Sequence, residues 1–126
     1  MPHIPDDRPL SPEERTLVRW LLEHGRPEAN RYLDHLGQAR VVSRCSCGCA
    51  SVNFAVAEHE TAPMAGMQVL ADYQWRDPSG HLAGIFAFAR EGVLAGLEVW
   101  SIDGEAAIDK LPPVEVLEPL GSAPSS

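Results

Sequence analysis

The chain has 126 residues, which is the usual size of one domain and long enough to bury a hydrophobic core. Its apolar fraction of 44% and charged fraction of 22% are ordinary for a globular protein. The net charge of −8 argues against a nucleic-acid partner, because phosphate backbones are bound by clustered Lys and Arg. An acidic surface suits solubility or the binding of a basic protein.

The N-terminal residues and the apolar segments predict where the protein resides. Residues 1–10 contain three prolines, lack the apolar core of a secretory signal and predict an extended lead-in. The longest apolar stretch is too short to span a bilayer. We therefore expect a cytoplasmic protein with no membrane partner, whose thiols are reduced by default.

Two helices are predicted next. Ser11 caps the first, Glu14 closes a capping box, and Gly25 ends the helix as a left-handed cap. Pro27 opens the second helix and Gly37 stops it. Both helices carry apolar residues at helical spacing, namely Leu17, Val18, Leu21 and Leu22 in the first and Ala29, Tyr32, Leu33 and Leu36 in the second.

From Arg40 onward the apolar pattern changes to the alternation that is typical of strands. Turn residues separate the later strands at 77–80 and 91–92. The predicted strands run from residue 41 into the cysteines and over 52–56, 69–75, 82–89 and 97–100. Residues 58–67 predict a loop, 82–89 a central strand covered on both faces, and 114–117 a helical turn or a last edge strand.

These elements predict a single α+β domain over residues 11–120. Its αα-hairpin should cover one face of an antiparallel sheet, because short turns join the strands. We expect about five strands, arranged as a meander. Residues 121–126 have the composition of a disordered tail.

All the cysteines of the chain, Cys45, Cys47 and Cys49, stand within five residues. Thiolates prefer soft metals, so the cluster is a candidate site for zinc or another soft metal such as copper(I). Its spacing differs from the usual zinc pairs, and a fourth ligand has to come from elsewhere. The candidates for that ligand are His59, His35 and His81. Apart from this possible metal at the cysteines, we expect no cofactor.

Two other interpretations fit the same stretch. If residues 46–48 form a three-residue hairpin loop, Cys45 and Cys49 face each other with Cα atoms about 5.5 Å apart, within disulfide range. The adjacent Arg44 favours a thiolate, and so a reactive or redox-switching thiol. Alternatively the stretch is only a tight hairpin, in which small residues permit a close turn and the cysteines pack as small hydrophobes.

Trp75 and Trp100 are candidate residues for a partner surface, together with Arg44. Tryptophans in strands belong to the core by default. If Trp75 and Trp100 share an exposed face of the sheet, they mark a protein-binding site.

Residues 41–54 contain the pattern Arg-Cys-x-Cys-Gly-Cys, and residues 96–104 contain a Leu-Glu-aliphatic-aromatic strand before an acidic turn. Together they resemble a family of short, uncharacterised bacterial proteins. The resemblance covers most of residues 10–117 and implies no activity. Ala50 stands where such sequences carry proline, which leaves the turn interpretation intact.

Three hypotheses of function follow. The first is a non-enzymatic protein that acts through a protein partner, for example a basic toxin, or through its own copies; size, acidity and the lack of a catalytic signature favour it. The second is a thiolate metal-binding or redox-sensing module built on the three cysteines. The third is an enzyme with a cysteine nucleophile, which needs a base within hydrogen-bond reach.

Overall fold

A computed structural model of the chain describes residues 3–45, 49–57, 59–60, 66–104 and 108–120. These residues form an α+β fold with an antiparallel sheet, which confirms the predicted class. The strands are β1 (His3–Pro9), β2 (Ala39–Cys45), β3 (Val52–Val56), β4 (His59–Glu60), β5 (Met67–Arg76), β6 (Leu82–Arg90), β7 (Val93–Ser101) and β8 (Glu118–Pro119). The helices are α1 (Pro12–Glu23) and α2 (Leu33–Leu36), with 3-10 turns η1 (Pro27–Tyr32) and η2 (Val114–Val116).

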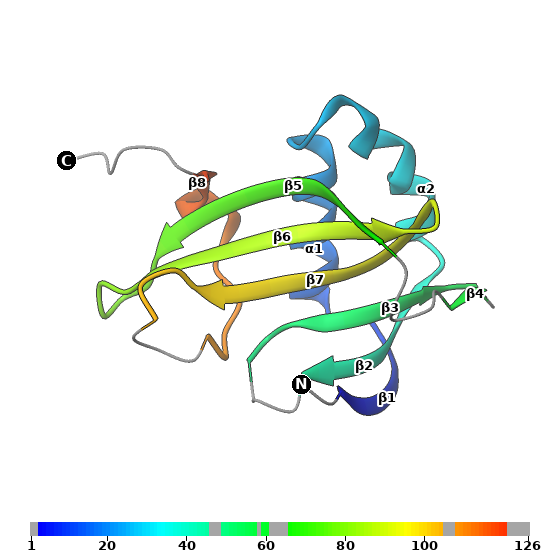
Figure 1. Ribbon diagram of the computed structural model, residues 1–126, viewed down its shortest axis with the longest axis horizontal. Coiled ribbons are helices and arrows are strands. Elements are labelled where there is room, and N and C mark those ends of the chain that lie inside the picture. The colour runs from blue at the N-terminus through cyan, green and yellow to red at the C-terminus, as the bar shows by residue number, and fades with distance from the viewer. Residues whose placement is uncertain (1–2, 46–48, 58, 61–65, 105–107, 121–126) are drawn as a thin grey trace.

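The order of the strands differs from the predicted meander of about five. In the described residues the order is β1-β2-β3-β7-β6-β5-β8, and β4 also pairs with β3. Two three-stranded meanders, β1-β2-β3 and β5-β6-β7, are therefore joined through β3 and β7 (Figure 1). Alternation of apolar residues sets which side chains share a face but does not choose the neighbouring strand, and this is why the sequence missed the β3–β7 pair.

The two long hairpins of the second meander form where turn residues predict them. The carboxylate of Asp77 accepts hydrogen bonds from the backbone N–H groups of Ser79 and His81, each 2.9 Å long. Between β6 and β7, Glu91 and Gly92 both have positive φ, 54° and 75°. A two-residue turn with two positive φ values matches the twist of the strands that it joins.

Helix α1 begins at the predicted capping box. The Ser11 hydroxyl accepts from the Glu14 N–H at 3.1 Å, and the Glu14 carboxylate accepts from the Ser11 N–H at 2.8 Å. The prediction of a left-handed Gly25 is wrong, because positive φ among the described glycines occurs only at three turn positions, 80, 92 and 104. At position 25 glycine is needed for space instead, since a Cβ on Gly25 would lie 2.4 Å from the carbonyl oxygen of Leu70.

The second predicted helix is mostly a 3-10 segment. η1 covers Pro27–Tyr32, and α2 adds a single α-helical turn. Arg26 provides no side-chain cap, and the three-residue repeat of a 3-10 helix puts the buried Ala29 and Tyr32 on one side. The predicted αα-hairpin is therefore only partly correct. Within the described residues, no helix is long and apolar enough to cross a membrane.

The lead-in contains a strand that the sequence analysis did not identify. β1 pairs with β2, and the ladder is irregular between Pro5 and Arg8. Proline is tolerated here because an edge strand has one side that needs no hydrogen bonds. An ion pair of 2.7 Å between Arg40 and Asp7 adds a second link between the two strands.

Both α-helices lie on one face of the sheet. α1 packs against β5 and β6, and α2 packs against β7, behind the sheet in Figure 1. Every second residue of β6 enters the core there, namely Ala83, Ile85, Ala87 and Ala89. The alternate residues define the other side, which we call the open face: Asp72, Gln74, Gly84, Phe86, Phe88, Gly96, Glu98 and Trp100. β6 is central, as predicted, but helices cover only one of its faces.

The C-terminal segment returns along the helix side of the sheet. The Ala50 N–H donates to the Ile108 carbonyl at 2.8 Å, and Leu111, Val114 and Leu117 pack on the core. η2 is followed directly by β8, which pairs with β5. Of the two alternatives predicted for 114–117, the helical turn forms there, and a short edge strand follows just beyond, at Glu118–Pro119. The predicted tail, 121–126, lies outside the described residues.

Candidate functional site

The cysteine cluster joins β2 to β3, as predicted for the first hairpin. The last pair of this ladder is Arg44 with Val52. Continued by one residue, that register sets Cys45 opposite Ser51 and not opposite Cys49. The three-residue loop with a Cys45–Cys49 pair therefore does not match the ladder. Cys47 and the side chain of Cys45 lie outside the described residues.

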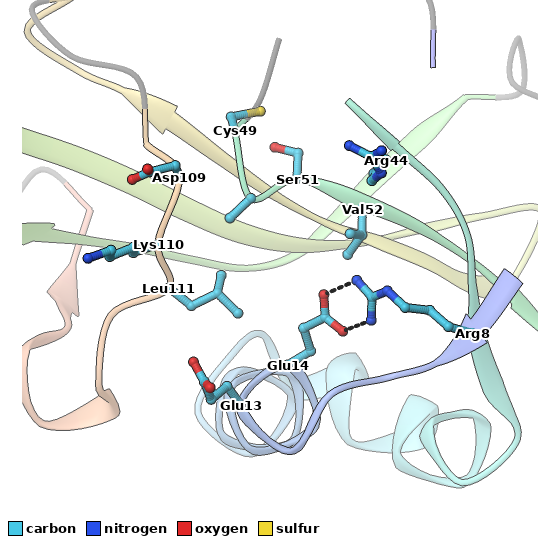
Figure 2. A pocket seen from close by; sticks show the side chains of 11 residues that line it. Arg8, Glu13, Glu14, Arg44, Cys49, Ser51, Val52, Asp109, Lys110 and Leu111 are labelled. Carbon is cyan, nitrogen blue, oxygen red and sulfur yellow. Dashed lines mark hydrogen bonds and ion pairs between the residues drawn. The ribbon is translucent and has the colours of Figure 1, made fainter. Parts of the chain in front are cut away.

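Cys49 and Arg44 line one cavity of about 510 Å³ (Figure 2). Cys49 is half-buried, and the Arg44 side chain is 49% exposed with its Nε 4.0 Å from the Asp6 carboxylate. The remaining lining residues come from β1, the start of α1, the start of β3 and the C-terminal segment: Arg8, Glu13, Glu14, Ala50, Ser51, Val52, Asp109, Lys110 and Leu111. The structure thus brings together a thiol and a guanidinium that the sequence singled out.

An ion pair forms the floor of this cavity. Arg8 donates two hydrogen bonds to the Glu14 carboxylate, at 2.8 and 3.0 Å (Figure 2). Burial by itself would raise the pKa of Glu14, but the bonds from Arg8 and from the Ser11 backbone outweigh it and lower the pKa from its ordinary 4.5. The hydrogen bond to Glu14 raises the pKa of Arg8 in turn. Both charged groups of this pair already have hydrogen-bond partners. We therefore interpret the pair as structural, holding β1 against the start of α1.

Ser51 lines the same cavity but has a structural role. Its hydroxyl accepts from the Val99 N–H at 2.9 Å and donates to the Val99 carbonyl at 3.1 Å. The buried side chain thereby continues the β3–β7 contact beyond the last backbone pair, Val52 with Leu97. A hydroxyl with both hydrogen bonds made to backbone is not available as a nucleophile.

The three predicted histidine ligands stand apart from the cysteines. His59 pairs with Val56 at one end of β3, whereas the cluster adjoins Val52 at the other end, about 13 Å away by the strand rise. His35 Nδ1 accepts from the Leu94 N–H at 3.2 Å. His81 Nδ1 lies 3.6 Å from the Asp103 carboxylate.

A fourth histidine, His3, stands opposite Cys45 in the β1–β2 ladder. The sequence analysis overlooked it because the lead-in was not predicted to pair with anything. Among the side chains that the structure describes, no three His, Cys, Asp or Glu gather as metal ligands. The side chains of Cys45, Cys47, His3 and His59 are not among those described.

Trp75 and Trp100 lie on opposite faces of the sheet. Trp75 pairs with Ala83 on the helix side, is 4% exposed and lines a second cavity of about 490 Å³ beside the C-terminal segment. Trp100 pairs with Gly84 on the open face and is 40% exposed. The condition under which both tryptophans would mark one protein-binding surface, a shared exposed face, is therefore not met, and Trp75 lies in the core as expected by default. The strand pairing, which sets the face, was not available from the sequence.

Two aromatic rings of the open face lie against glycines of the neighbouring strand. A Cβ on Gly84 would come 2.5 Å from Nε1 of Trp100, and a Cβ on Gly96 would come 2.6 Å from Cζ of Phe88. Such pairs let a large ring cover backbone that a glycine leaves bare. The available signal in the sequence was that Gly84, Phe86 and Phe88 occupy every second position of β6 and so share one face.

Comparison of the chain with family models, with curated proteins and with solved structures finds no match. The resemblance to short bacterial proteins with the Arg-Cys-x-Cys-Gly-Cys pattern stays a prediction. Function has to be argued from the geometry of the site.

Proposed function

We propose that this protein acts by binding another protein, or a second copy of itself, through the open face, and that it does so without catalysis. The observation that supports the proposal most is Trp100, of which 40% is exposed on the side of the sheet that carries neither α-helix. Tryptophan is enriched among the residues that dominate protein–protein binding energy. Half-buried Phe86 extends the aromatic surface from the neighbouring strand.

A site-specific crosslink tests this function. Phe86 is replaced by p-benzoylphenylalanine, which keeps an aromatic ring on the open face, and cells that make the protein are irradiated. The matched control carries the same group at Arg19, an exposed position of α1. We expect a discrete adduct of higher mass from position 86 and none from position 19. No adduct at either position, or the same adducts at both, would contradict the proposal.

A second candidate function is a thiolate metal-binding or redox-sensing module. The β1–β2 register favours it, because it sets His3 opposite Cys45, and histidine is a residue type that accompanies cysteine in zinc sites. Metal analysis and thiol titration of freshly purified protein test it, with His3→Ala as the comparison. Bound zinc that falls in the variant supports the module. Metal-free protein with three unreactive thiols removes it.

The third hypothesis, an enzyme with a cysteine nucleophile, stays a prediction. Alkylation rates decide it, because an activated thiolate reacts faster than an ordinary thiol. If no cysteine is labelled faster than a free thiol, the hypothesis fails.

A further inference from the structure

A cavity on the helix side of the sheet lies between the end of β5 and the C-terminal segment. Its volume is about 490 Å³, which falls within the range of about 300–1,000 Å³ that small-molecule sites occupy. Trp75 lines it from the sheet, and Ile108 and Val116 line it from the C-terminal segment. It has only residues 109–111 in common with the cavity that Cys49 lines.

The walls of this cavity are mainly apolar and are held by the core. Trp75 and Ile108 are only 4% and 6% exposed. The C-terminal segment is anchored where the Ala50 N–H donates to the Ile108 carbonyl at 2.8 Å, and Leu111 packs against the core. Three prolines restrict the backbone of the lining further, namely Pro78, Pro112 and Pro113. Walls that are fixed before a ligand arrives lower the entropic cost of binding it.

The indole N–H of Trp75 is a hydrogen-bond donor without an acceptor. None of the described residues accepts from it, although the N–H of a buried tryptophan usually has a partner. In the described part of the chain, Nε of Arg90 is the one fully enclosed side-chain nitrogen or oxygen that lacks a partner. The Trp75 N–H is therefore reached by solvent, and the solvent space that this indole lines is the cavity. A ligand with an acceptor atom would complete the hydrogen bond.

The charges around the cavity are balanced. The lining contains two cations and two carboxylates, namely Arg76, Lys110, Asp77 and Asp109. One of each sign is engaged in the turn after β5: the Arg76 guanidinium donates to the Gly80 carbonyl at 2.7 Å, and the Asp77 carboxylate accepts two backbone hydrogen bonds of 2.9 Å. The other two are exposed neighbours of opposite sign. The cavity therefore favours a neutral ligand over an ion of either sign.

We propose that this cavity binds a small neutral molecule with an apolar ring and one hydrogen-bond acceptor, of the class of the aryl ketones. The ring lies against Trp75 and Ile108, and the acceptor receives the Trp75 indole N–H. Removal of the ring from water contributes most of the binding free energy. The single hydrogen bond fixes the orientation and selects for the acceptor. Because the cavity lies on the helix side, its occupation does not depend on protein binding at the open face.

Titration with Prodan, a neutral naphthyl ketone whose emission moves to shorter wavelength in apolar surroundings, tests the site. We expect saturable binding with a blue shift. Trp75→Phe keeps an aromatic ring but removes the N–H, and should weaken binding about two- to tenfold, the scale of one neutral hydrogen bond. The matched control is Trp100→Phe, the same substitution on the open face, which should leave the affinity unchanged. Circular dichroism checks that both variants are folded.

Obstruction of the cavity is a second test. Val116 and Leu120 are both exposed apolar residues near the C-terminus, at 44% and 39%, but only Val116 lines the cavity. Val116→Trp should weaken Prodan binding at least about fivefold, because the added ring and the ligand compete for one volume. Leu120→Trp should bind Prodan as wild type does. Equal affinities of the two variants would show that Prodan binds elsewhere and would overturn the proposal.

Displacement of Prodan from the wild-type protein defines the ligand class without any substitution. Acetonaphthone carries the acceptor and should displace Prodan at lower concentration than ethylnaphthalene, which lacks it. Naphthoate carries a charge that the cavity does not compensate and should compete poorly. The proposal is overturned if Prodan does not bind, if ethylnaphthalene competes as well as acetonaphthone, or if naphthoate competes best. It is also overturned if Trp75→Phe, in its folded form, binds Prodan as tightly as Trp100→Phe does.

Discussion

The two faces of the sheet treat a carboxylate shielded from solvent in opposite ways, where Glu14 is buried and Asp72 half-buried. On the helix side, Glu14 receives two hydrogen bonds from Arg8 and one from the Ser11 backbone, and its pKa is lowered. On the open face, Asp72 receives none from the described residues, and burial raises its pKa. The same chemical group thus stabilises the fold on one face and opposes it on the other.

This difference indicates that the helix side of the sheet mainly stabilises the fold, whereas the open face is the proposed binding surface. The helix face carries aliphatic residues with almost no exposure, such as Leu21 and Ile85, which is what a stable core requires. On the open face Phe88 is buried, but Trp100 and Phe86 are partly exposed, and Asp72 receives no hydrogen bond from the described residues. Such features lower stability and are kept for other reasons. Substitutions on the two faces should therefore change the free energy of unfolding by different amounts, and in one case in the opposite direction.

Leu21→Ala should have the largest effect. Leu21 is fully buried between α1 and the sheet, so its truncation leaves a cavity and should lower the free energy of unfolding by about 2–5 kcal/mol. Urea denaturation followed by circular dichroism measures the change. Trp100→Ala is the comparison on the open face and should cost clearly less. Equal losses would mean that the open face contributes as much to folding as the core.

Gly96→Ala should be the next most damaging substitution. An added Cβ would lie 2.6 Å from both the Phe88 ring and the Val52 carbonyl oxygen, and the carbonyl cannot move without separating β3 from β7. We expect a loss of about 1–3 kcal/mol in urea denaturation, as for overpacking.

Gly84→Ala is the matched control for this prediction. At Gly84 the three nearest atoms all belong to the Trp100 side chain, which is exposed enough to shift. This variant should cost less than Gly96→Ala and should change the tryptophan emission spectrum. If Gly84→Ala lowers the free energy of unfolding more than Gly96→Ala does, contact with the backbone carbonyl is not what makes Gly96→Ala destabilising.

The features that the sequence predicted correctly depend on residues that are close together in the chain, and those that it missed depend on residues far apart. The capping box of Ser11 and Glu14 and the turns at Asp77 and Gly92 depend on residues within four positions, and all three formed as predicted. The pairing of β3 with β7 joins residues more than forty positions apart, as Val52 with Leu97 shows. Loop closure over such distances leaves little local signal.

The candidate site shows the same division. Cys49 and Arg44, five residues apart, line one cavity, in line with their place in one motif. The sequence left open whether Trp75 and Trp100 share an exposed face, because the face depends on which residues they oppose across strands, and the structure separates them. In the sequence Asp72 is one of several strand and turn acids, and nothing there sets it apart, since the absence of a hydrogen-bond donor to it among the described residues is a property of the folded chain.

Glu14→Gln should lower the free energy of unfolding by about 1–2 kcal/mol at neutral pH, because a charge-assisted pair and half of a capping box are weakened. The pKa of Glu14 is lowered in the folded state, so its stabilisation is complete above the ordinary value of 4.5 and is lost as the pH falls through the folded-state pKa. Urea denaturation from pH 7 to pH 3 should show wild type and variant converging in acid.

The exposed neighbour provides the control for this pH dependence. Glu13→Gln removes a carboxylate from the same turn of α1, where Glu13 is exposed. Its stability should stay close to that of wild type throughout. A difference between wild type and Glu14→Gln that persists unchanged to pH 3 would show that the charge of Glu14 is not what stabilises the joint.

Asp72→Asn should have the smallest effect, with the opposite sign. Burial raises the pKa of Asp72 above its ordinary 3.8, and the Arg26 charge offsets this only partly, so the folded state holds the proton more tightly than the unfolded state. Stability from this group therefore falls as the pH rises through that window, and the cost persists at neutral pH. The variant should gain up to about 0.5 kcal/mol at pH 7, the scale of substitutions outside the core, and nothing below pH 3.8.

A loss of stability at pH 7 would instead mean that the Asp72 carboxylate has a stabilising partner in the free protein, and the contrast with Glu14 would disappear. A carboxylate that lowers stability in the free protein is expected at a surface that is selected for something other than folding. The opposite signs expected for Asp72→Asn and Glu14→Gln at pH 7 therefore compare the two faces of the sheet directly.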